Sequence, residues 1–303
     1  MSIAIFGSIN MDLVVRAAHI PAPGETILGS DFVTVPGGKG ANQAVAVARL
    51  GGDAHLIGAV GDDGFGNQLC ASLSGYGVSI AQVRRLPGAS GVALITVDDT
   101  GQNSIVVASG ANMRMQHEIL DSVEQVLATC THLLVQLEVP LELVVATLQL
   151  AKRRGVTTVL DPAPAPTAAL PDELYQYADI MTPNEHETHQ LTGIVPDTEA
   201  QARAAADILH ARGAAHVIIK RGARGAFWSH AGQTLSVPAV PVAVVDTVAA
   251  GDCYNGALAC ALARGEHMPS AMQYAAAAAA IAVTRRGAQG AMPTAAEVSA
   301  LLG

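Results

Sequence analysis

The chain has 303 residues, enough for one large α/β domain with a sizeable core, and 50% of them are hydrophobic while only 3% are aromatic. Such a core of Ala, Val, Leu and Ile is typical of parallel strands buried under helices. With 17 Lys and Arg against 26 Asp and Glu, the formal net charge of −9 argues against a nucleic-acid partner. The expected ligand is therefore a small molecule.

No apolar stretch approaches the length of a membrane span, and the N-terminus lacks the basic flank and cleavage site of a signal peptide. These features predict a cytoplasmic protein with no membrane partner. The four cysteines show no C-x-x-C spacing, which argues against a disulfide framework or a zinc knuckle. Cys253 is the one candidate for a reactive thiol, because a helix N-terminus can lower a thiol pKa; an inert core thiol is the favoured alternative.

Short aliphatic runs alternate with Ala-rich amphipathic stretches, which is the βαβ pattern of a mainly parallel central sheet flanked by helices. The expected strands are residues 3–6, 55–60, 132–136, 157–160, 180–182 and 216–220. The expected helices are residues 41–50, 66–74, 141–152, 184–192, 198–212 and 255–263. Three prolines exclude regular structure from residues 161–167, so we expect a stiff loop there.

Two regions break this alternation, because turns rather than helices join their strand-like segments in pairs. The segments are residues 13–16, 30–35, 91–97 and 103–108. We expect a single α/β domain over residues 1–303 with a small antiparallel β lid, whose strands come from about 13–36 and 91–108. A small sheet with an apolar face does not stand alone in water, so this lid should cover a ligand, a partner subunit, or both.

Asn10 and Asp12 follow the first predicted strand at alternate positions, so both side chains can point the same way. Open α/β sheets bind ligands at such strand ends. A carboxylate and an amide side by side can hold adjacent sugar hydroxyls, although a capping or turn role fits the pair equally well.

Residues 36–43 (PGGKGANQ) place three glycines around a lysine at a predicted helix start. The glycines allow the backbone to approach a ligand closely, while Lys39 and Asn42 offer donors to hydroxyl oxygens. The segment is not a Walker A loop, because Gly40 follows the lysine, and no dinucleotide fingerprint follows the first strand. A tight turn without a ligand is the alternative.

The most informative segment is residues 245–256 (VDTVAAGDCYNG), where an extended apolar run gives way to a helix. Backbone N–H groups at a helix start are unpaired and lie at the positive end of the macrodipole, so small residues there leave donors open to a phosphate. Asp252 then places a carboxylate beside an anion site. That arrangement is costly unless the carboxylate takes a proton from a substrate hydroxyl. An ordinary helix entry capped by Asp is the alternative.

Several segments resemble, in order and approximate spacing, the ribokinase-like family of carbohydrate kinases. They are GSINMD (7–12), GGKGANQA (37–44), DPAP (161–164), TPNE (182–185) and DTVAAGD (246–252). The first glycine-rich run, with QLE (136–138) and TRRGAQ (284–289), is similar to the ribokinase branch in particular. The resemblance covers nearly the whole chain and implies a ribokinase-like fold.

The implied activity is ATP-dependent phosphorylation of D-ribose at O5, giving D-ribose 5-phosphate. A kinase for 2-deoxyribose or another furanose is the alternative within the family. A non-catalytic sugar-binding protein is disfavoured, because the acid at position 252 and the small residues before it are intact. The resemblance also implies a homodimer through the lid sheets.

The resemblance implies roles for individual residues. Those implied to hold the sugar are Asn10, Asp12, Gly38, Lys39, Asn42 and Glu138. Asp252 corresponds to the base that deprotonates the 5-hydroxyl, and the anion hole for the γ-phosphoryl group corresponds to the amides of Ala249, Ala250, Gly251 and Asp252.

The nucleotide is implied to lie against Asn184, Lys220, Arg221, Gly222, Ala223, Arg224, Gly225, Gly251 and Ala276. Asn184 and Glu187 match an N-x-x-E pair that organises Mg²⁺ through water, which suits an ion that keeps several of its own waters. Ala276 replaces a polar residue that often lies near the adenine.

The family's activation by a monovalent cation, K⁺, is implied to involve Asp246, Val248, Ala282, Arg285, Gly287 and Ala291. Ala291 replaces the usual serine, so this position lacks a side-chain oxygen. Ala249 stands where the wider family commonly has glycine, and we expect little cost because a negative φ would suit alanine.

Overall fold

The structure is a computed structural model that describes residues 1–165 and 168–303. Residues 161–165 form neither helix nor strand, as predicted for the proline-rich loop, and the last two positions of that predicted loop, 166 and 167, lie outside the described residues. No helix within the described ranges is long and apolar enough to cross a membrane.

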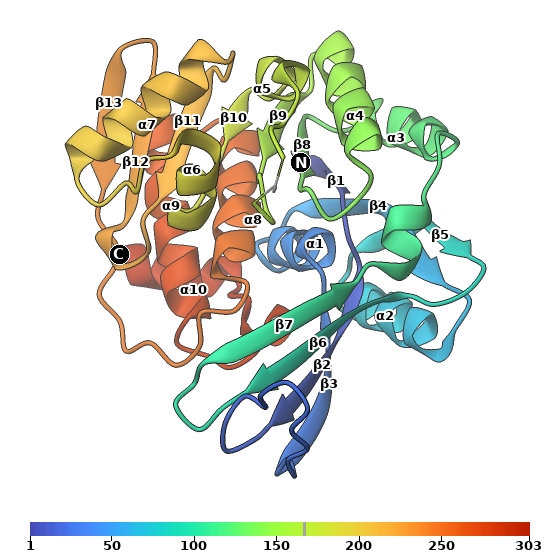
Figure 1. Ribbon diagram of the computed structural model, residues 1–303. Helices are drawn as coiled ribbons and strands as arrows, with labels where there is room; N and C mark the ends of the chain where they lie inside the picture. Colours follow the sequence, from blue (N-terminus) through green and yellow to red (C-terminus); the bar gives the residue numbers. More distant parts are fainter. Residues whose placement is uncertain (166–167) are drawn as a thin grey trace.

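The described residues contain a central sheet of nine strands in the order β13-β12-β11-β10-β9-β8-β1-β4-β5 (Figure 1). Its strands are β1 (Ser2–Phe6), β4 (Asp53–Gly61), β5 (Ser79–Leu86), β8 (His132–Val135), β9 (Thr157–Leu160), β10 (Ile180–Met181), β11 (His216–Lys220), β12 (Ala226–His230) and β13 (Gln233–Val237). From β5 to β11 all neighbours pair in parallel, and β12 and β13 add an antiparallel edge. The predicted, mainly parallel α/β sheet is confirmed.

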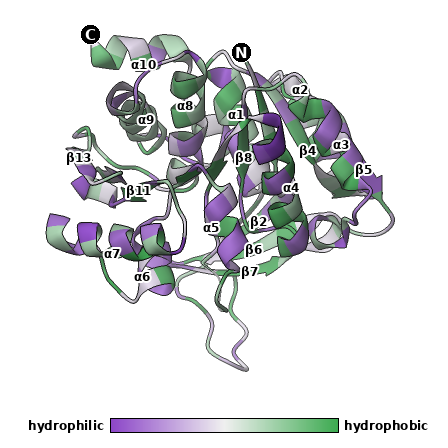
Figure 2. Cartoon of the chain, turned by 90° about the horizontal axis from the view of Figure 1, so that it is seen from above, coloured by the Kyte–Doolittle hydropathy of each residue, from purple (hydrophilic) through white to green (hydrophobic). Residues whose placement is uncertain are grey.

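Helices cover both faces of this sheet (Figure 2). One face is covered by α1 (Lys39–Arg49), α2 (Gly64–Gly75), α8 (Ala250–Ala263), α9 (Met268–Ala282) and α10 (Ala295–Leu302). The other is covered by α3 (Ile119–Leu127), α4 (Leu141–Arg154), α5 (Asp172–Tyr177), α6 (Glu185–Thr192) and α7 (Glu199–Ala211). In β1, Ile3 and Ile5 enter the first core while Ala4 and Phe6 enter the second, because successive strand side chains alternate between faces.

All six predicted strands and all six predicted helices have counterparts, but some elements were missed. The missed strands are β5, β12 and β13, and the missed helices are α3, α5, α9 and α10. Helix α8 begins at Ala250 rather than at residue 255. Its first turn carries small and polar residues, so hydrophobic periodicity does not mark it.

Four strands form a second, small sheet in the order β3-β2-β6-β7, extending below the body of the molecule in Figure 1. They are β2 (Asn10–Arg16), β3 (Asp31–Gly37), β6 (Gly91–Val97) and β7 (Asn103–Ala108). The predicted hairpins β2–β3 and β6–β7 are antiparallel, whereas β2 and β6 pair in parallel because each enters from the same end of the main sheet.

Both faces of this lid sheet carry exposed apolar side chains. The strand register places Asn10 and Asp12 on one face, together with Ile105 and Val107, which are exposed. Exposed residues of the opposite face include Phe32, Leu94 and Val106. Each face therefore exposes apolar area, which is typical of a surface that contacts a ligand or another protein.

Candidate active site

The polar residues of the site follow the carboxyl ends of the parallel strands. Asn10 lies beyond β1, Gln136 and Glu138 follow β8, Asp161 follows β9, and Lys220 ends β11. Because parallel strands bring these ends to one edge of the sheet, side chains far apart in the sequence meet there. Helices α1 and α8 start at the same place and complete the site.

Asp252, in the first turn of α8, is buried and is held by two amides from α1. Asn42 Nδ2 donates to its Oδ2 over 3.0 Å, and Gln43 Nε2 donates to its Oδ1 over 3.1 Å. The N-cap of α8 is Ala249, and the carboxylate makes no capping hydrogen bond. The alternative interpretation of Asp252 as a helix cap is therefore wrong.

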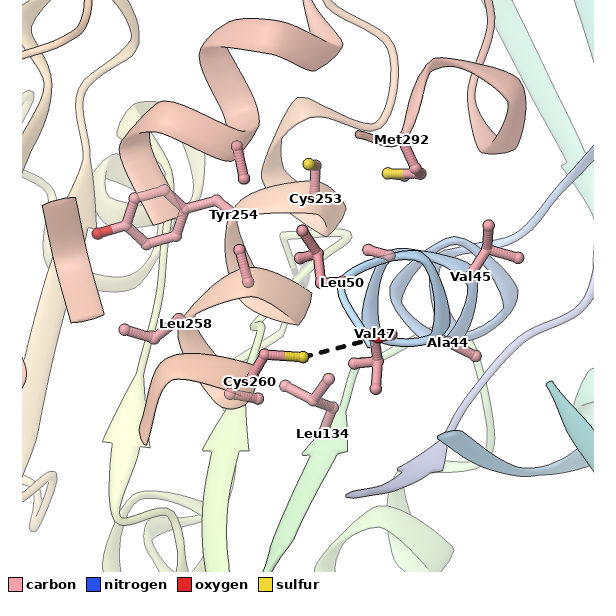
Figure 3. Close-up of a cluster of buried hydrophobic side chains, with 14 of the residues drawn as sticks. Ala44, Val45, Val47, Leu50, Leu134, Cys253, Tyr254, Leu258, Cys260 and Met292 are labelled. Atoms are coloured by element: carbon pink, nitrogen blue, oxygen red, sulfur yellow. Dashed lines mark hydrogen bonds between the residues drawn. The ribbon is translucent and has the colours of Figure 1, made fainter. Parts of the chain in front are cut away.

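Close packing of α1 against α8 fixes this arrangement (Figure 3). A Cβ placed on Gly256 would lie 2.7 Å from the Cβ of Ala46, so only glycine allows the two helices to approach this closely. One turn further along, the Cys260 thiol donates to the carbonyl of Val47 over 3.7 Å. Cys253 is fully buried and burial raises its pKa, so it is a core thiol.

The electrostatic surroundings of Asp252 favour a base that works near neutral pH. Burial raises its pKa, the charge of Lys39 lowers it, and the charge of Asp161 raises it, for a result of about 6. The hydrogen bonds from Asn42 and Gln43 also lower it. The carboxylate is then ionised at pH 7 but close to the range where it accepts a proton.

The amides at the start of α8 form a nearly open anion hole. In the described part of the chain, the N–H groups of Ala249, Gly251 and Asp252 donate to no protein atom. The N–H of Ala250 is engaged, donating to the carbonyl of Thr247 over a long 3.3 Å. Three of the four predicted donors are thus available to an anion.

Ala249 corrects an expectation from the sequence. Its φ is +58°, in the left-handed region, rather than negative. A left-handed residue followed by a right-handed helix turns successive amides toward one point, which is a backbone nest for an anion. The conformation costs an alanine about 1 kcal/mol or more, so the turn imposes strain where the donors converge.

The predicted sugar residues gather around Glu138. Its Oε2 accepts from Ser8 Oγ at 2.5 Å, from the Lys39 N–H at 3.4 Å, and from Asn10 Nδ2 at 3.5 Å. Gly38 has a φ of +91°, and a Cβ there would lie 2.6 Å from the Asn10 nitrogen. Gly38 therefore shapes the site through its lack of a side chain.

Acidic groups and a lysine influence one another at this site. Burial, then the charges of Glu138 and Asp252, raises the pKa of Asp12 to about 7, although Lys39 lowers it. For Lys39 burial lowers the pKa, but the carboxylates of Asp252 and Glu138 reverse the effect and raise it overall. The lysine thus stays charged among acceptors that suit sugar hydroxyls.

Asn112, which the sequence analysis missed, orients Asn10. It lies in the 3₁₀ helix η1 (Gly110–Arg114), directly after the lid strand β7, and is buried. Its Nδ2 donates to Asn10 Oδ1 over 2.7 Å and to the Ile9 carbonyl over 3.2 Å, while its Oδ1 accepts from the Ile9 N–H over 3.0 Å. No motif marks it, because its partners come from the first strand of the lid.

Gln43, Gln136 and Asp161 were also missed as site residues. Gln136 Nε2 donates to Gln43 Oε1 over 2.6 Å, which fixes the orientation of the Gln43 amide. Gln43 Nε2 then donates to both Asp252 and Asp161, over 3.1 Å each. Gln136 and Asp161 directly follow buried strands, a position that could have identified them.

The pair Asn184 and Glu187 forms the capping box of α6. Glu187 accepts from the N–H of Asn184 at 2.7 Å and from its Nδ2 at 2.9 Å, while the Glu187 N–H donates to Asn184 Oδ1 over 2.8 Å. Burial and the charge of Asp161 raise the pKa of Glu187. Since the carboxylate is already bonded, these residues fit a cation that approaches through water rather than directly.

The predicted nucleotide loop, residues 220–225, is held largely by its own arginines. Arg221 is buried and donates to the carbonyls of Pro196 and Asp197, over 2.9 and 2.7 Å. Arg224 pairs with Glu185 and Asp197. Gly222 and Gly225 both have positive φ and turn the chain, so Ala223 lies in a tight exposed bend. Ala276, in the middle of α9, is partly buried against the core.

The predicted K⁺ loops are adjacent. Asp246 Oδ1 accepts from the Val248 N–H at 3.0 Å, and its Oδ2 accepts from the Gly287 N–H at 2.9 Å. Arg285 is turned to Glu297, and Ala291 is buried. Ala282 ends α9 beside these loops. Among the described residues no three His, Cys, Asp or Glu side chains group as a metal site.

A sugar kinase of the ribokinase-like fold is the class of protein that this sheet, lid and anion hole define. The family described as pfkB family carbohydrate kinase matches residues 1–295. The chain therefore belongs to the pfkB family of carbohydrate kinases.

The chain is also similar to individual sugar kinases. The ribokinase of Haemophilus influenzae is 40% identical, over 97% of this chain and 95% of its own length. The deoxyribokinase of Salmonella typhimurium is 37% identical, over 97% of this chain and 96% of its own length. The structure of Arabidopsis thaliana ribokinase complexed with ribose and ATP superposes with a TM-score of 0.92 at 32% identity, covering 99% of this chain and 98% of that one.

Proposed function

We propose that the protein is a ribokinase that transfers the γ-phosphoryl group of ATP to O5 of D-ribose, giving D-ribose 5-phosphate and ADP. The observation that carries the proposal is the buried carboxylate of Asp252, held by two amides beside helix-start N–H groups that have no protein partner. The comparison with ribokinases, one of them complexed with ribose and ATP, supports the same activity.

The reaction divides between a base and a set of donors. Asp252 takes the proton of the 5-hydroxyl as O5 forms a bond to phosphorus. The bond from phosphorus to the bridging oxygen of ATP breaks, and ADP leaves. The amides of Ala249, Gly251 and Asp252 point at the charge that develops on the transferring group and stabilise it.

The sugar binds between the main sheet and the lid in this proposal. Glu138 and Asp12 accept from its hydroxyls, while Lys39, Asn42 and Asn10 donate to them. The lid, built from about residues 13–36 and 91–108 of a single domain, then closes over the sugar and excludes water that would otherwise take the phosphoryl group.

Two cations belong to the proposal. Asn184 and Glu187 would hold Mg²⁺ through water, and the ion would supply positive charge against the phosphates of ATP. K⁺ would bind where Asp246, Val248 and Gly287 meet, using backbone oxygens. Equal turnover in K⁺ and in a large organic cation would remove the second part of this proposal.

A homodimer through the lid sheets is also proposed. Support comes from the exposed apolar residues on both lid faces, since a bound sugar covers only one of them. Phe32, Leu94 and Val106 are the expected contacts with the partner subunit. We place the enzyme in the cytoplasm, where ATP is available and the four buried cysteines stay reduced.

A coupled ADP-release assay with a panel of pentoses tests the substrate. We expect D-ribose to give the highest kcat/KM, because Asp12 offers an acceptor for a hydroxyl that 2-deoxyribose lacks. A higher kcat/KM for 2-deoxyribose would assign the chain to the alternative that its deoxyribokinase relatives represent. The absence of ADP release with every sugar would refute the kinase itself.

A further inference from the structure

We propose that Lys220 is a catalytic residue whose ammonium group contacts the phosphoryl group in transfer, and that Asp161 positions it. The proposal rests on the kinase function proposed above. It adds a cation, supplied by the main sheet, to the backbone donors of α8.

The first observation is a buried ion pair between two strand ends. Lys220 Nζ lies 3.0 Å from Asp161 Oδ1, and the two side chains are only 12% and 4% exposed. Taking both charges out of water is expensive and is seldom repaid by the pair alone. The three other pairs of Lys or Arg with Asp among the described residues are more exposed, so their charges stay in water. A buried pair of this kind therefore indicates a functional role for one of its two residues.

The second observation is where the ammonium lies. A Cβ placed on Gly251 would lie 3.3 Å from Lys220 Nζ. Gly251 is the second residue of α8 and its N–H has no partner in the described chain. The ammonium therefore stands beside the donors that face the incoming phosphoryl group.

The third observation is that Lys220 keeps donors to spare. Its Nζ makes one hydrogen bond within the described residues, to Asp161, and an ammonium group has three hydrogens. Two remain for phosphoryl oxygens. Arg221 and Arg224, its neighbours in the loop, are both occupied by protein acceptors, so neither supplies this charge.

The base and the cation share one support. The Gln43 amide donates to Asp252 and to Asp161, whose other oxygen holds Lys220. The distance between the proton acceptor and the ammonium thus depends on one side chain, whose amide is oriented by Gln136. The role of the Lys220 ammonium is to balance charge on the equatorial oxygens as the bond to ADP breaks.

Replacement of Lys220 by Met tests the proposal. Removing one such donor costs about 10²–10³-fold in kcat, and we expect that loss with KM for D-ribose little changed. The affinity for ATP should fall more than the affinity for ADP, since only ATP carries the γ-phosphoryl group. This binding readout needs no sugar, so it stays informative even if the wild-type protein phosphorylates none of the pentoses.

Two further variants separate catalysis from folding. K220M alone leaves Asp161 unpaired, whereas the double variant K220M/D161N removes both charges and should recover thermal stability. If kcat stays low in the double variant, the ammonium acts on the reaction. Recovery of kcat together with stability would overturn the proposal, because Lys220 would then only neutralise Asp161.

Lys152→Met is the matched control. Lys152 forms an ion pair with Asp179 over 2.8 Å, away from the carboxyl ends of the strands. Its loss should leave kcat and the ATP-to-ADP affinity ratio unchanged. An equal loss of kcat in this variant would show that the effect of K220M is not specific.

Discussion

Helices α6 and α8 both begin at the site, but the first amides of α6 are capped by side chains and those of α8 are not. The start of α6 is closed by its own side chains, because Asn184 and Glu187 form a complete capping box. The start of α8 has an alanine at the N-cap, in the left-handed region, and no side-chain cap. Helix α6 uses its donors for stability, whereas α8 leaves them open at a cost in stability.

The open start of α8 does not reflect a general lack of capping residues in this chain. The same chain caps α7 and α10 with complete boxes led by Thr198 and Thr294. Other helices of the chain, such as α4 and α9, also lack a side-chain cap, but the uncapped start of α8 lies beside a buried carboxylate, which is the arrangement that binding an anion explains.

Lowering the pH should have the largest effect, because it removes the charge of the carboxylate beside the open start of α8. The pKa values of Asp12 and Asp252 are raised to about 7 and about 6, so both lose their charge as the pH falls through this range. We expect kcat/KM for D-ribose to decline below pH 7 and, below pH 6, to fall by up to about 100-fold per pH unit as two essential carboxylates protonate. A pH profile that stays flat down to pH 5 would contradict the assignment of Asp252 as the base.

Asn112→Asp tests whether Asn112 orients Asn10 for sugar binding. The change keeps the acceptor for the Ile9 N–H but removes both hydrogen bonds that Asn112 donates, including the one to Asn10. Losing a buried partner costs about 1–3 kcal/mol, so KM for D-ribose should rise about tenfold or more while KM for ATP stays near its original value. Equal rises in both constants would indicate a general loss of structure.

Removing the capping boxes of α6 and α7 separates a cap at the proposed site from a cap that serves stability alone. Asn184→Ala and Thr198→Ala should each lower the free energy of unfolding by about 1 kcal/mol, measured by denaturant titration. Only the first is expected to raise KM for ATP, because Asn184 belongs to the predicted nucleotide site whereas Thr198 does not. A normal KM in Asn184→Ala would confine that residue to capping.

Ala249→Gly has the smallest expected effect. Glycine relieves the strain of the positive φ but gains more entropy in the unfolded chain, so the net stabilisation is about 0.5 kcal/mol. Turnover should stay close to normal because the amides are unchanged. A loss of stability by the same measurement would show that the alanine is not strained in this turn.

The sequence alone predicts those candidate residues whose proposed chemistry depends on local order. Asp252 and the small residues before it stand out because a helix start follows an apolar run, and Lys39 stands out among glycines. Their neighbours in space were harder to find. Gln43 is one residue past a predicted contact, yet its importance comes from Asp161 and Gln136, which reach it from two other strands.

The remaining misses have physical causes as well. The φ of Ala249 follows from the turn that α8 requires, and no intrinsic preference of alanine indicates it. Strand β5 was missed because its polar residues, among them Arg84 and Arg85, hide the apolar alternation of an edge strand. The parallel pairing of β2 with β6 depends on how the lid joins the main sheet, which local turns do not reveal.

The account depends on the acid and the amides at the start of α8 acting together, and Asp252→Asn tests this most directly. The asparagine keeps the shape of the side chain but cannot accept the proton. We expect kcat to fall by about 10²–10⁴-fold, while the Kd for D-ribose, measured by calorimetry, stays close to that of the wild type. Near-normal turnover with undisturbed ribose binding would contradict the account.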